Sequence, residues 1–187
     1  YFVEYIRQQL MAMYGRNEVY KSGLKVYTSL NLEKQIVAQN VTKKNLHNAD
    51  KRYGYRGPLG TMDISLPETV LQENLREINN LKDGALPTAG TIIHGLVKSV
   101  ERKLVTILIG QGEGVIELKD MNWAREPDVK IDGRWASISR IDKTLHPGDE
   151  IMVRVLGVHE SGSFWSLSLE QEPEVEAALI SIEPDTG

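Results

Sequence analysis

The spacing of apolar residues changes once along this chain, near Thr91, and no other feature of the sequence constrains the fold as strongly. Before this point apolar residues recur three or four positions apart, which is the period of an amphipathic helix. After it, short segments alternate apolar and polar residues, which is the period of a half-buried β-strand. The sequence therefore predicts an α+β protein, with helices in its first half and a sheet in its second.

The second half contains five alternating segments, and their order indicates a sheet that closes on itself. We expect these strands at about residues 91–100, 103–109, 113–118, 150–157 and 163–169. The glycines at 110, 112 and 114 permit the turns and bulges that such closure needs. A long connection, residues 119–149, separates the third strand from the fourth. Five strands with an irregular or partly helical link after the third match the order of an OB-fold, so we predict a small five-stranded OB-like β-barrel.

The first half predicts two helices joined by a short extended segment. Apolar residues at helical spacing favour a helix over residues 1–14, which Gly15 ends in the manner of a C-cap. Residues 24–29 alternate and predict a short strand. Asn31 then stands where a side chain can N-cap a helix that runs to about residue 48.

Two further elements flank the predicted barrel. Ser65 is followed three positions later by Glu68, which is the form of a capping box, and it predicts a helix start just before the barrel. The apolar face expected for that helix consists of Leu71, Leu75 and Ile78. After the barrel, residues 177–182 predict a sixth strand that ends in a turn-like sequence.

Charge is distributed unevenly along the chain, which has a formal net charge of -4. Residues 1–57 carry ten basic and four acidic side chains, residues 58–89 two and five, residues 90–170 ten and twelve, and residues 171–187 none and five. Barrels that bind nucleic acid use a basic groove with exposed aromatic rings, so the acidic balance of residues 90–170 disfavours that function. The absence of cysteine excludes a disulfide scaffold and a thiolate metal site. No apolar run approaches the roughly 18 residues of a membrane span.

Patterns associated with catalysis occur, but their settings argue against catalysis. Ser22 and Lys25 have the Ser-x-x-Lys spacing of serine enzymes that react with penicillin. In those enzymes the serine begins a helix, whereas here Gly23 follows it and Lys25 lies in an alternating segment. Ser29-Leu30-Asn31 fits the Ser-x-Asn motif of those enzymes, but only three residues separate it from Lys25. Lys143-Thr144 lacks the glycine of their Lys-Thr-Gly motif. We expect no catalytic residue in this chain. The four histidines, His47, His94, His146 and His159, lack ligand spacing, so we expect no metal or other cofactor.

Aromatic residues with neighbouring arginines are the candidate binding residues. Trp123 with Arg125, and Arg134 with Trp135, lie in the long connection of the predicted barrel. Such pairs suit stacking on sugars, bases or a peptide, although rings that plug the end of the barrel explain them equally well. We expect Trp165, in the last strand, to belong to the core.

Several strings of this sequence resemble one family in order along the whole chain. Residues 23–35 read Gly-Leu-Lys-Val-Tyr-Thr-Ser-Leu-Asn-Leu-Glu-Lys-Gln, and residues 51–58 read Lys-Arg-Tyr-Gly-Tyr-Arg-Gly-Pro. Residues 171–173 read Gln-Glu-Pro, and residues 178–187 read Ala-Leu-Ile-Ser-Ile-Glu-Pro-Asp-Thr-Gly. These strings resemble the class A (bifunctional) penicillin-binding proteins, in particular their 1A branch. Ser29 and Asn31 replace the threonine and aspartate that are usual there.

The resemblance implies how the chain is organised. Residues 1–57 would be the linker after a glycosyltransferase domain, and residues 58–89 a connecting loop and helix. Residues 90–170 would be the OB-like barrel, and residues 171–187 would begin a transpeptidase domain with its first strand. The motifs of both catalytic domains are absent from this sequence, so no catalytic residue carries over.

The resemblance also implies a parent protein with two activities. The parent would be anchored in the bacterial inner membrane, on its periplasmic face, and would polymerise glycan strands from lipid II and cross-link their peptides. The partners of this chain would be the parent's glycosyltransferase and transpeptidase domains, together with a regulatory lipoprotein or another protein of cell-wall synthesis. Membrane contact would come only through the parent's anchor.

Two functions from different classes remain open from the sequence. The first is a non-catalytic module that spaces two enzyme domains and offers a docking surface in cell-wall synthesis. The alternative is an OB-fold domain that binds nucleic acid, because the strand layout also resembles RNA-binding OB domains of the ribosomal-protein type. The acidic balance and the aliphatic strands favour the first.

Overall fold

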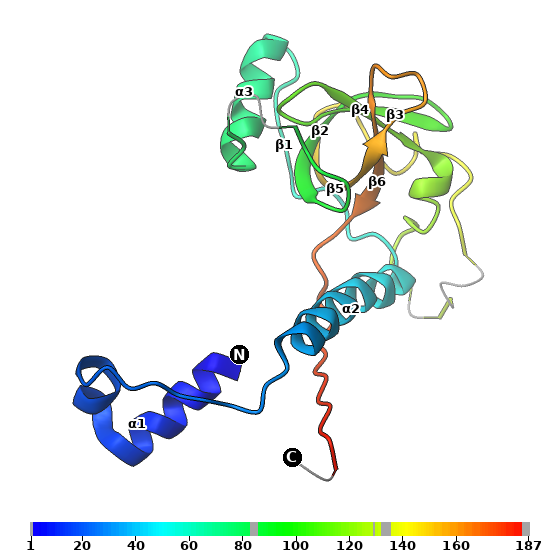
Figure 1. The fold of residues 1–187 in the computed structure, drawn as a ribbon. Helices are drawn as coiled ribbons and strands as arrows, with labels where there is room; N and C mark the ends of the chain where they lie inside the picture. The colour runs from blue at the N-terminus through cyan, green and yellow to red at the C-terminus, as the bar shows by residue number, and fades with distance from the viewer. Residues whose placement is uncertain (1, 83–85, 129, 132–135, 185–187) are drawn as a thin grey trace. The chain divides into compact units, whose positions relative to one another are not determined.

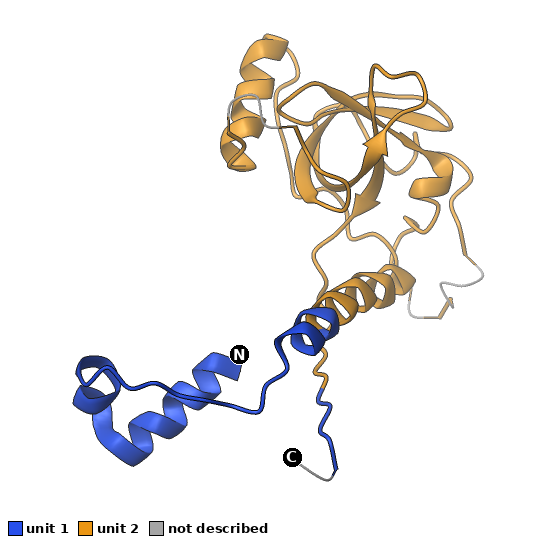
Figure 2. Cartoon of the chain, in the orientation of Figure 1, with its two compact units in different colours: residues 1–38, 180–187 blue, residues 39–179 orange. Residues whose placement is uncertain are grey.

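The computed structural model describes residues 2–82, 86–128, 130–131 and 136–184. Its helices are α1 (Phe2–Lys21), α2 (Leu32–Asp50) and α3 (Glu68–Ile78), with short 3-10 turns at Lys51–Tyr53 and Leu118–Asp120. Its strands are β1 (Gly60–Thr61), β2 (Ile92–Val100), β3 (Leu104–Leu108), β4 (Glu113–Glu117), β5 (Asp149–Val158) and β6 (Trp165–Glu170) (Figure 1). The chain divides into two compact units, residues 1–38 with 180–187 and residues 39–179, which Figure 2 distinguishes.

The strands form one sheet that closes into a barrel. Their order is β1-β5-β2-β3-β4-β6, and β5 also pairs with β6, which completes the ring. The β4–β6 pair is parallel, and every other pair is antiparallel. The predicted OB-like barrel is confirmed, with each of its five strands beginning and ending within two residues of the expected bounds. The two-residue strand β1, which adjoins the start of β5, was not predicted.

The barrel encloses a core of aliphatic side chains. Alternate residues of each strand point inward, and they are fully buried, as the period of two requires. The long connection between β4 and β5 contributes Met121, Ala124, Ile141 and Leu145 to the same core, all of them at most 1 % exposed. Trp165 packs against this core as expected. The connection therefore plugs the barrel rather than standing away from it.

The glycine-rich stretch forms the turn between β3 and β4, as predicted. Gly110 has a φ of +85°, and a Cβ there would lie 2.9 Å from the backbone nitrogen of Arg76. At Gly114 a Cβ would lie 2.4 Å from Cδ1 of Leu167, on the parallel neighbour β6. These two positions require glycine because the chain turns tightly at one and two strands approach closely at the other.

Helix α3 covers part of the outside of the barrel. Leu71 and Leu75 of α3 pack on Leu96 and Leu108, which are neighbouring partners on β2 and β3. The Asn79 side chain fixes the end of the helix: its amide donates to the His94 carbonyl (2.9 Å), and its oxygen accepts from the His94 amide (2.7 Å). The barrel thus has a second, external apolar layer.

Two details of α3 correct the sequence prediction. The capping box is wrong, because the helix begins at Glu68 after Pro67, and the Ser65 amide instead donates to the Asp63 side chain (2.9 Å) in a preceding turn. Ile78 was expected on the buried face but is 40 % exposed, since α3 ends there and the chain turns toward Asn79. Leu71 and Leu75 are buried as expected.

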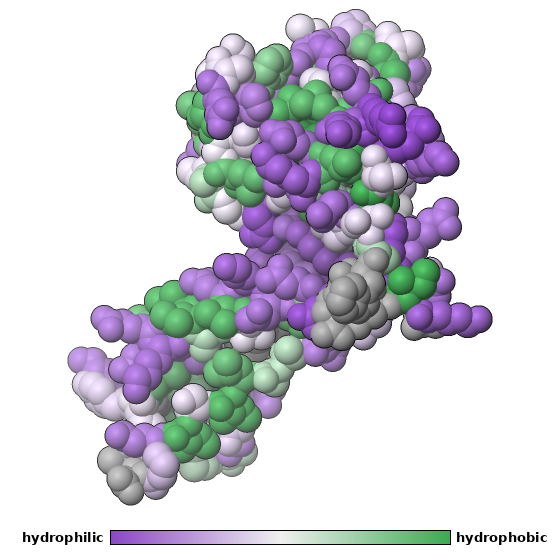
Figure 3. Space-filling model, turned by 90° about the vertical axis from the view of Figure 1, so that its right-hand side faces the viewer, coloured by the Kyte–Doolittle hydropathy of each residue, from purple (hydrophilic) through white to green (hydrophobic). Residues whose placement is uncertain are grey.

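The N-terminal helices have little of their surface buried. Gly15 interrupts α1 with a non-helical conformation (φ 79°, ψ 161°), and a further helical segment continues to Lys21. The predicted N-cap of α2 is confirmed, because the Lys34 amide donates to the Asn31 side chain (3.0 Å). Figure 3 shows hydrophobic residues exposed over the helical part of the chain. Among the described helices, none is both long enough and apolar enough to cross a membrane.

The two outer segments predicted as strands are extended but form no strand. Neither residues 24–29 nor residues 177–182 carry a ladder within the described part of the chain. A β-strand exists through hydrogen bonds to a neighbouring strand, and no described residue pairs with either segment in this way. Tyr27 and Ile180 are accordingly 90 % and 83 % exposed.

Candidate functional site

A cluster of polar residues joins the end of α2 and the turn after it to the segment after β6, and we call it the polar junction (Asp50, Arg56, Gln171 and Glu174). Asp50 and Gln171 are buried, whereas Arg56 and Glu174 are exposed. Asp50, the last residue of α2, is 1 % exposed. Both terminal nitrogens of Arg56 donate to its carboxylate (3.1 and 2.9 Å). The Gln171 amide and the Glu174 backbone amide donate to the same carboxylate (2.7 and 3.1 Å). Asp50 therefore binds residues that lie more than 120 positions further along the chain.

Local backbone geometry holds the junction in place. Gly54 has a φ of +101°, and a Cβ there would lie 2.7 Å from the carbonyl oxygen of Arg125, so only glycine fits. The Gly54 carbonyl accepts from the Gln171 amide (2.9 Å), and the Arg56 amide donates to the Gln171 side-chain oxygen (3.1 Å). Arg56 also pairs with Glu174 (3.2 Å) and donates to the Glu172 carbonyl. Hydrogen bonds and an ion pair thus join the turn after α2 to the segment after β6.

The ionisation of Asp50 follows from these contacts. Burial by itself would raise the pKa of Asp50, but hydrogen bonds from Arg56, the Glu174 amide and Gln171 outweigh burial and lower this pKa. The carboxylate is therefore charged at neutral pH and fully occupied. A carboxylate in this state anchors its neighbours and is not free to act as a base.

A second buried carboxylate, Glu170, lies beside the junction at the end of β6. Arg154 and Lys51 both donate to its Oε1 atom (2.7 and 2.8 Å), and Nδ1 of His47 lies 3.3 Å from its Oε2 atom. Glu170 and His47 are almost inaccessible to solvent. Removing one member of such a set leaves a buried charge uncompensated, which is strongly destabilising. This second group ties the end of α2 to the barrel strands β5 and β6.

The predicted binding residues Trp123 and Arg125 lie near the junction and contact the chain itself. The Trp123 ring meets Tyr55 edge to face (centroids 6.0 Å apart), and Nζ of Lys51 lies 5.2 Å from its centroid. Arg125 donates to the carbonyls of Glu126, Arg52 and Ile131 (2.9 Å each). Their role in binding stays a prediction. Arg134 and Trp135, the other two predicted residues, lie outside the described residues.

Helix α3 occupies a surface that OB-folds commonly use for ligands. In OB-folds the faces of the second and third strands bind oligonucleotides and oligosaccharides. In this chain those strands are β3 and β4, and Leu71 and Leu75 of α3 pack over Leu108 of β3 and Leu96 of β2 beside it. Part of the usual binding face is therefore covered by the chain's own helix.

The histidines do not assemble a metal site in the described part of the chain. No group of three or more His, Asp or Glu side chains there is arranged to hold an ion. His94 instead pairs with Glu150 across β2 and β5 (2.7 Å), and His47 faces Glu170.

The polar junction was missed by reasoning from the sequence. Arg56 and Gln171 stand inside strings that carried the family resemblance, residues 51–58 and 171–173, and Asp50 and Glu174 directly adjoin these strings, but nothing local pairs them. Asp50 and Gln171 are 121 positions apart. The available signal was a set of charged residues at the two borders of the predicted barrel.

Comparisons with known proteins place this fold in one family. A family model described as the penicillin-binding protein OB-like domain matches residues 55–175, which include the whole barrel, α3 and most of the junction. The chain belongs to this family of penicillin-binding protein domains. The resemblance to the 1A branch of class A penicillin-binding proteins is confirmed.

The individual relatives are penicillin-binding proteins 1A. The chain is 30 % identical over 188 residues to that of Escherichia coli, and 28 % over 189 residues to that of Vibrio cholerae. In both cases all of this chain is covered, but only 21 % and 22 % of the relative. A crystal structure of penicillin-binding protein 1A from Haemophilus influenzae matches 91 % of this chain and 22 % of that one, with a TM-score of 0.55 and 22 % identity. The chain thus spans about a fifth of the length of these relatives.

Proposed function

We propose that this chain is a non-catalytic module of a bifunctional peptidoglycan synthase, where it spaces the catalytic domains and offers a docking surface. Membership of the penicillin-binding protein OB-like domain family supports a role in cell-wall synthesis. The synthase would act on the periplasmic face of the inner membrane, and its glycosyltransferase and transpeptidase domains would be the immediate partners of this module.

The polar junction is the single observation that carries the spacer role. A spacer must fix the direction in which the chain leaves relative to the direction in which it arrives. Asp50, at the end of α2, binds Gln171 and the backbone of Glu174 after β6. Buried charge-assisted hydrogen bonds of this kind hold a defined geometry that a flexible linker lacks.

The nucleic-acid alternative receives less support. The barrel has the required topology, but α3 covers part of the face that would bind, and residues 90–170 carry more acidic than basic side chains. Polyanion binding draws most of its affinity from basic groups facing phosphates.

Two changes in the full-length synthase test the spacer role. Arg56→Ala removes the bidentate partner of Asp50, and insertion of two glycines after Glu176 leaves the junction intact but lengthens the segment beyond it. We expect both to lower peptide cross-linking relative to glycan polymerisation, because the two active sites lose their fixed separation. The readout is the ratio of cross-linked to uncross-linked product made from lipid II.

Asp142→Asn is the matched control, because Asp142 forms an exposed pair with Arg140 on the surface of the barrel. It should leave the ratio unchanged. If the glycine insertion, like this control, leaves the ratio of cross-linked to uncross-linked product unchanged while penicillin still binds the protein, the module does not act as a geometric spacer.

A further inference from the structure

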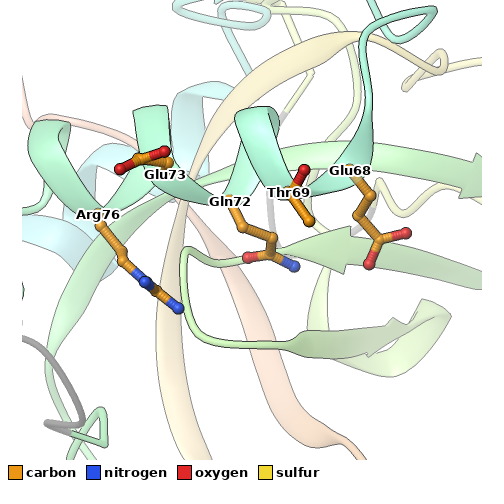
Figure 4. A pocket seen from close by; sticks show the side chains of 5 residues that line it. All are labelled: Glu68, Thr69, Gln72, Glu73 and Arg76. Atoms are coloured by element: carbon orange, nitrogen blue, oxygen red, sulfur yellow. The ribbon is translucent and has the colours of Figure 1, made fainter.

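A groove runs along α3 on the outside of the barrel unit. Five residues of that helix line it: Glu68, Thr69, Gln72, Glu73 and Arg76. In Figure 4 the side chains of Glu68, Gln72 and Arg76 extend from α3 toward the β3–β4 hairpin. The amide of Gln72 donates to the Gly112 carbonyl (3.0 Å), and Nε of Arg76 donates to the Gly110 carbonyl (2.6 Å). These bonds join α3 to the hairpin and give the groove a fixed floor.

An apolar pocket adjoins the groove at Glu68, which lines both. The remaining lining residues of the pocket are Ile64, Leu66, Leu71, Leu96, Lys98 and Leu108. Leu71, Leu96 and Leu108 are buried, whereas Ile64 and Leu66 are 45 % and 43 % exposed. Apolar side chains clustered at a concave surface gain free energy when a partner removes them from water. The pocket is therefore suited to one apolar side chain of a partner.

The groove and its immediate surroundings carry four carboxylates, Glu68, Glu73, Glu77 and Glu113, against two cations, Arg76 and Lys98. Lys98 is already shared between Glu68 (2.8 Å) and Glu113. Glu73 forms no ion pair with any residue that the structure describes, and Glu77 follows one turn later on the same helix. Electrostatic complementarity therefore favours a cationic group here and disfavours phosphate.

We propose that this groove docks a peptide segment of a partner protein, with an apolar side chain in the pocket and a Lys or Arg against Glu73. The proposal rests on the docking role put forward above and gives it a place and a partner chemistry. The apolar pocket and the acidic groove meet at Glu68, so an apolar residue followed closely by basic residues would reach both.

Short synthetic peptides binding to the 187-residue chain test this proposal. The probes contain Leu-Ala-Lys-Lys, Ser-Ala-Lys-Lys or Leu-Ala-Glu-Glu between identical flanks, and an oligothymidylate serves as the polyanion probe. Amide chemical shifts in a ¹⁵N spectrum report where each probe binds. We expect saturable shifts at Thr69, Gln72 and Leu108 with Leu-Ala-Lys-Lys, weaker binding when serine replaces leucine, and none with the acidic peptide or the oligonucleotide.

Two charge reversals distinguish peptide binding in the groove from general attraction of the peptide to acidic surface residues. Glu73→Lys should weaken binding of the Leu-Ala-Lys-Lys peptide by about fivefold or more, as removal of a facing charge at a binding surface does. Glu101→Lys makes the same change of charge at an exposed turn between β2 and β3 and should leave the affinity unaltered.

Equal weakening by both reversals, shifts spread over other acidic surfaces, or preferential binding of the oligonucleotide would each overturn the proposal. Because the peptide test uses binding and the spacer test uses the cross-linking ratio, either can fail while the other holds.

Discussion

The barrel and the N-terminal helices use apolar residues in opposite ways. In the barrel the alternate residues of five strands and the plug between β4 and β5 are buried in one core. In α1 no described residue is buried, and in the first turns of α2 Leu32, Ile36 and Val37 remain 49 to 65 % exposed. Most apolar side chains of the barrel strands are therefore buried, although Leu156 and Val158 are exposed, whereas those of the helices are mostly exposed. Figure 3 shows hydrophobic patches over both parts. One part thus has a core of its own, whereas the described residues of the other include no buried core.

The largest effect expected from this difference concerns one leucine in each region. Leu167→Ala in β6 removes a fully buried side chain and should lower the free energy of unfolding by about 3 kcal/mol, within the usual range for a leucine cavity. Leu32→Ala at the exposed start of α2 should change it by less than about 0.5 kcal/mol. Urea denaturation followed by tryptophan fluorescence measures both. Similar losses from the two substitutions would show that the helices fold cooperatively with the barrel.

The polar junction belongs neither to the apolar core of the barrel nor to the exposed helices. Its contribution to the free energy of unfolding can be measured through its dependence on pH. Asp50→Asn keeps the shape of the side chain but removes its charge, and at neutral pH it should cost on the order of 2 kcal/mol, as for hydrogen bonds to a charged group. The pKa of Asp50 is lowered by folding, so the stabilisation is present above the unfolded-state value of about 3.9 and is lost as pH falls through the folded-state value.

The difference in unfolding free energy between wild type and Asp50→Asn should therefore shrink as the pH is lowered below about 4. Thermal unfolding monitored by circular dichroism over a pH series measures it. A difference that stays constant through acid pH would mean that Asp50 does not contribute through its charge.

The contrast between the regions also explains what could be predicted from the sequence. Strand β2 was expected at residues 91–100 and is observed at Ile92–Val100, because alternation reports burial on one face directly. Leu71 and Leu75 were recognised as an apolar pair, but their targets on β2 and β3 were not, since the pattern of a helix does not say what covers it. Ser65 failed as a cap because Asp63 competes for the same local backbone.

The contacts of the polar junction could not be predicted from local sequence patterns for a different reason. Its hydrogen bonds join Asp50 and Arg56 to residues 171–174, so they depend on closure of the barrel that brings the two borders together. Charged residues such as Glu170 are usually assigned to the surface, and only the completed fold reveals that Arg154, Lys51 and His47 surround it. Local periodicity therefore predicts elements well and predicts contacts between distant polar residues poorly.

The smallest expected effect tests the helical region alone. Asn31→Ala removes the side chain that accepts the Lys34 amide at the start of α2, and loss of such a cap costs about 1 kcal/mol of local helix stability. Because the first turns of α2 bury little apolar surface, this loss should appear as fraying, with a small decrease in helical ellipticity, and should leave the barrel transition in urea unchanged. Asn122→Ala, at an exposed position in the plug, is the control for removal of an asparagine side chain. A shift of the barrel transition by Asn31→Ala, with none from the control, would mean that the start of α2 is coupled to the barrel through the helix, and the division between a self-sufficient barrel and dependent helices would have to move to the N-terminal side of Asn31.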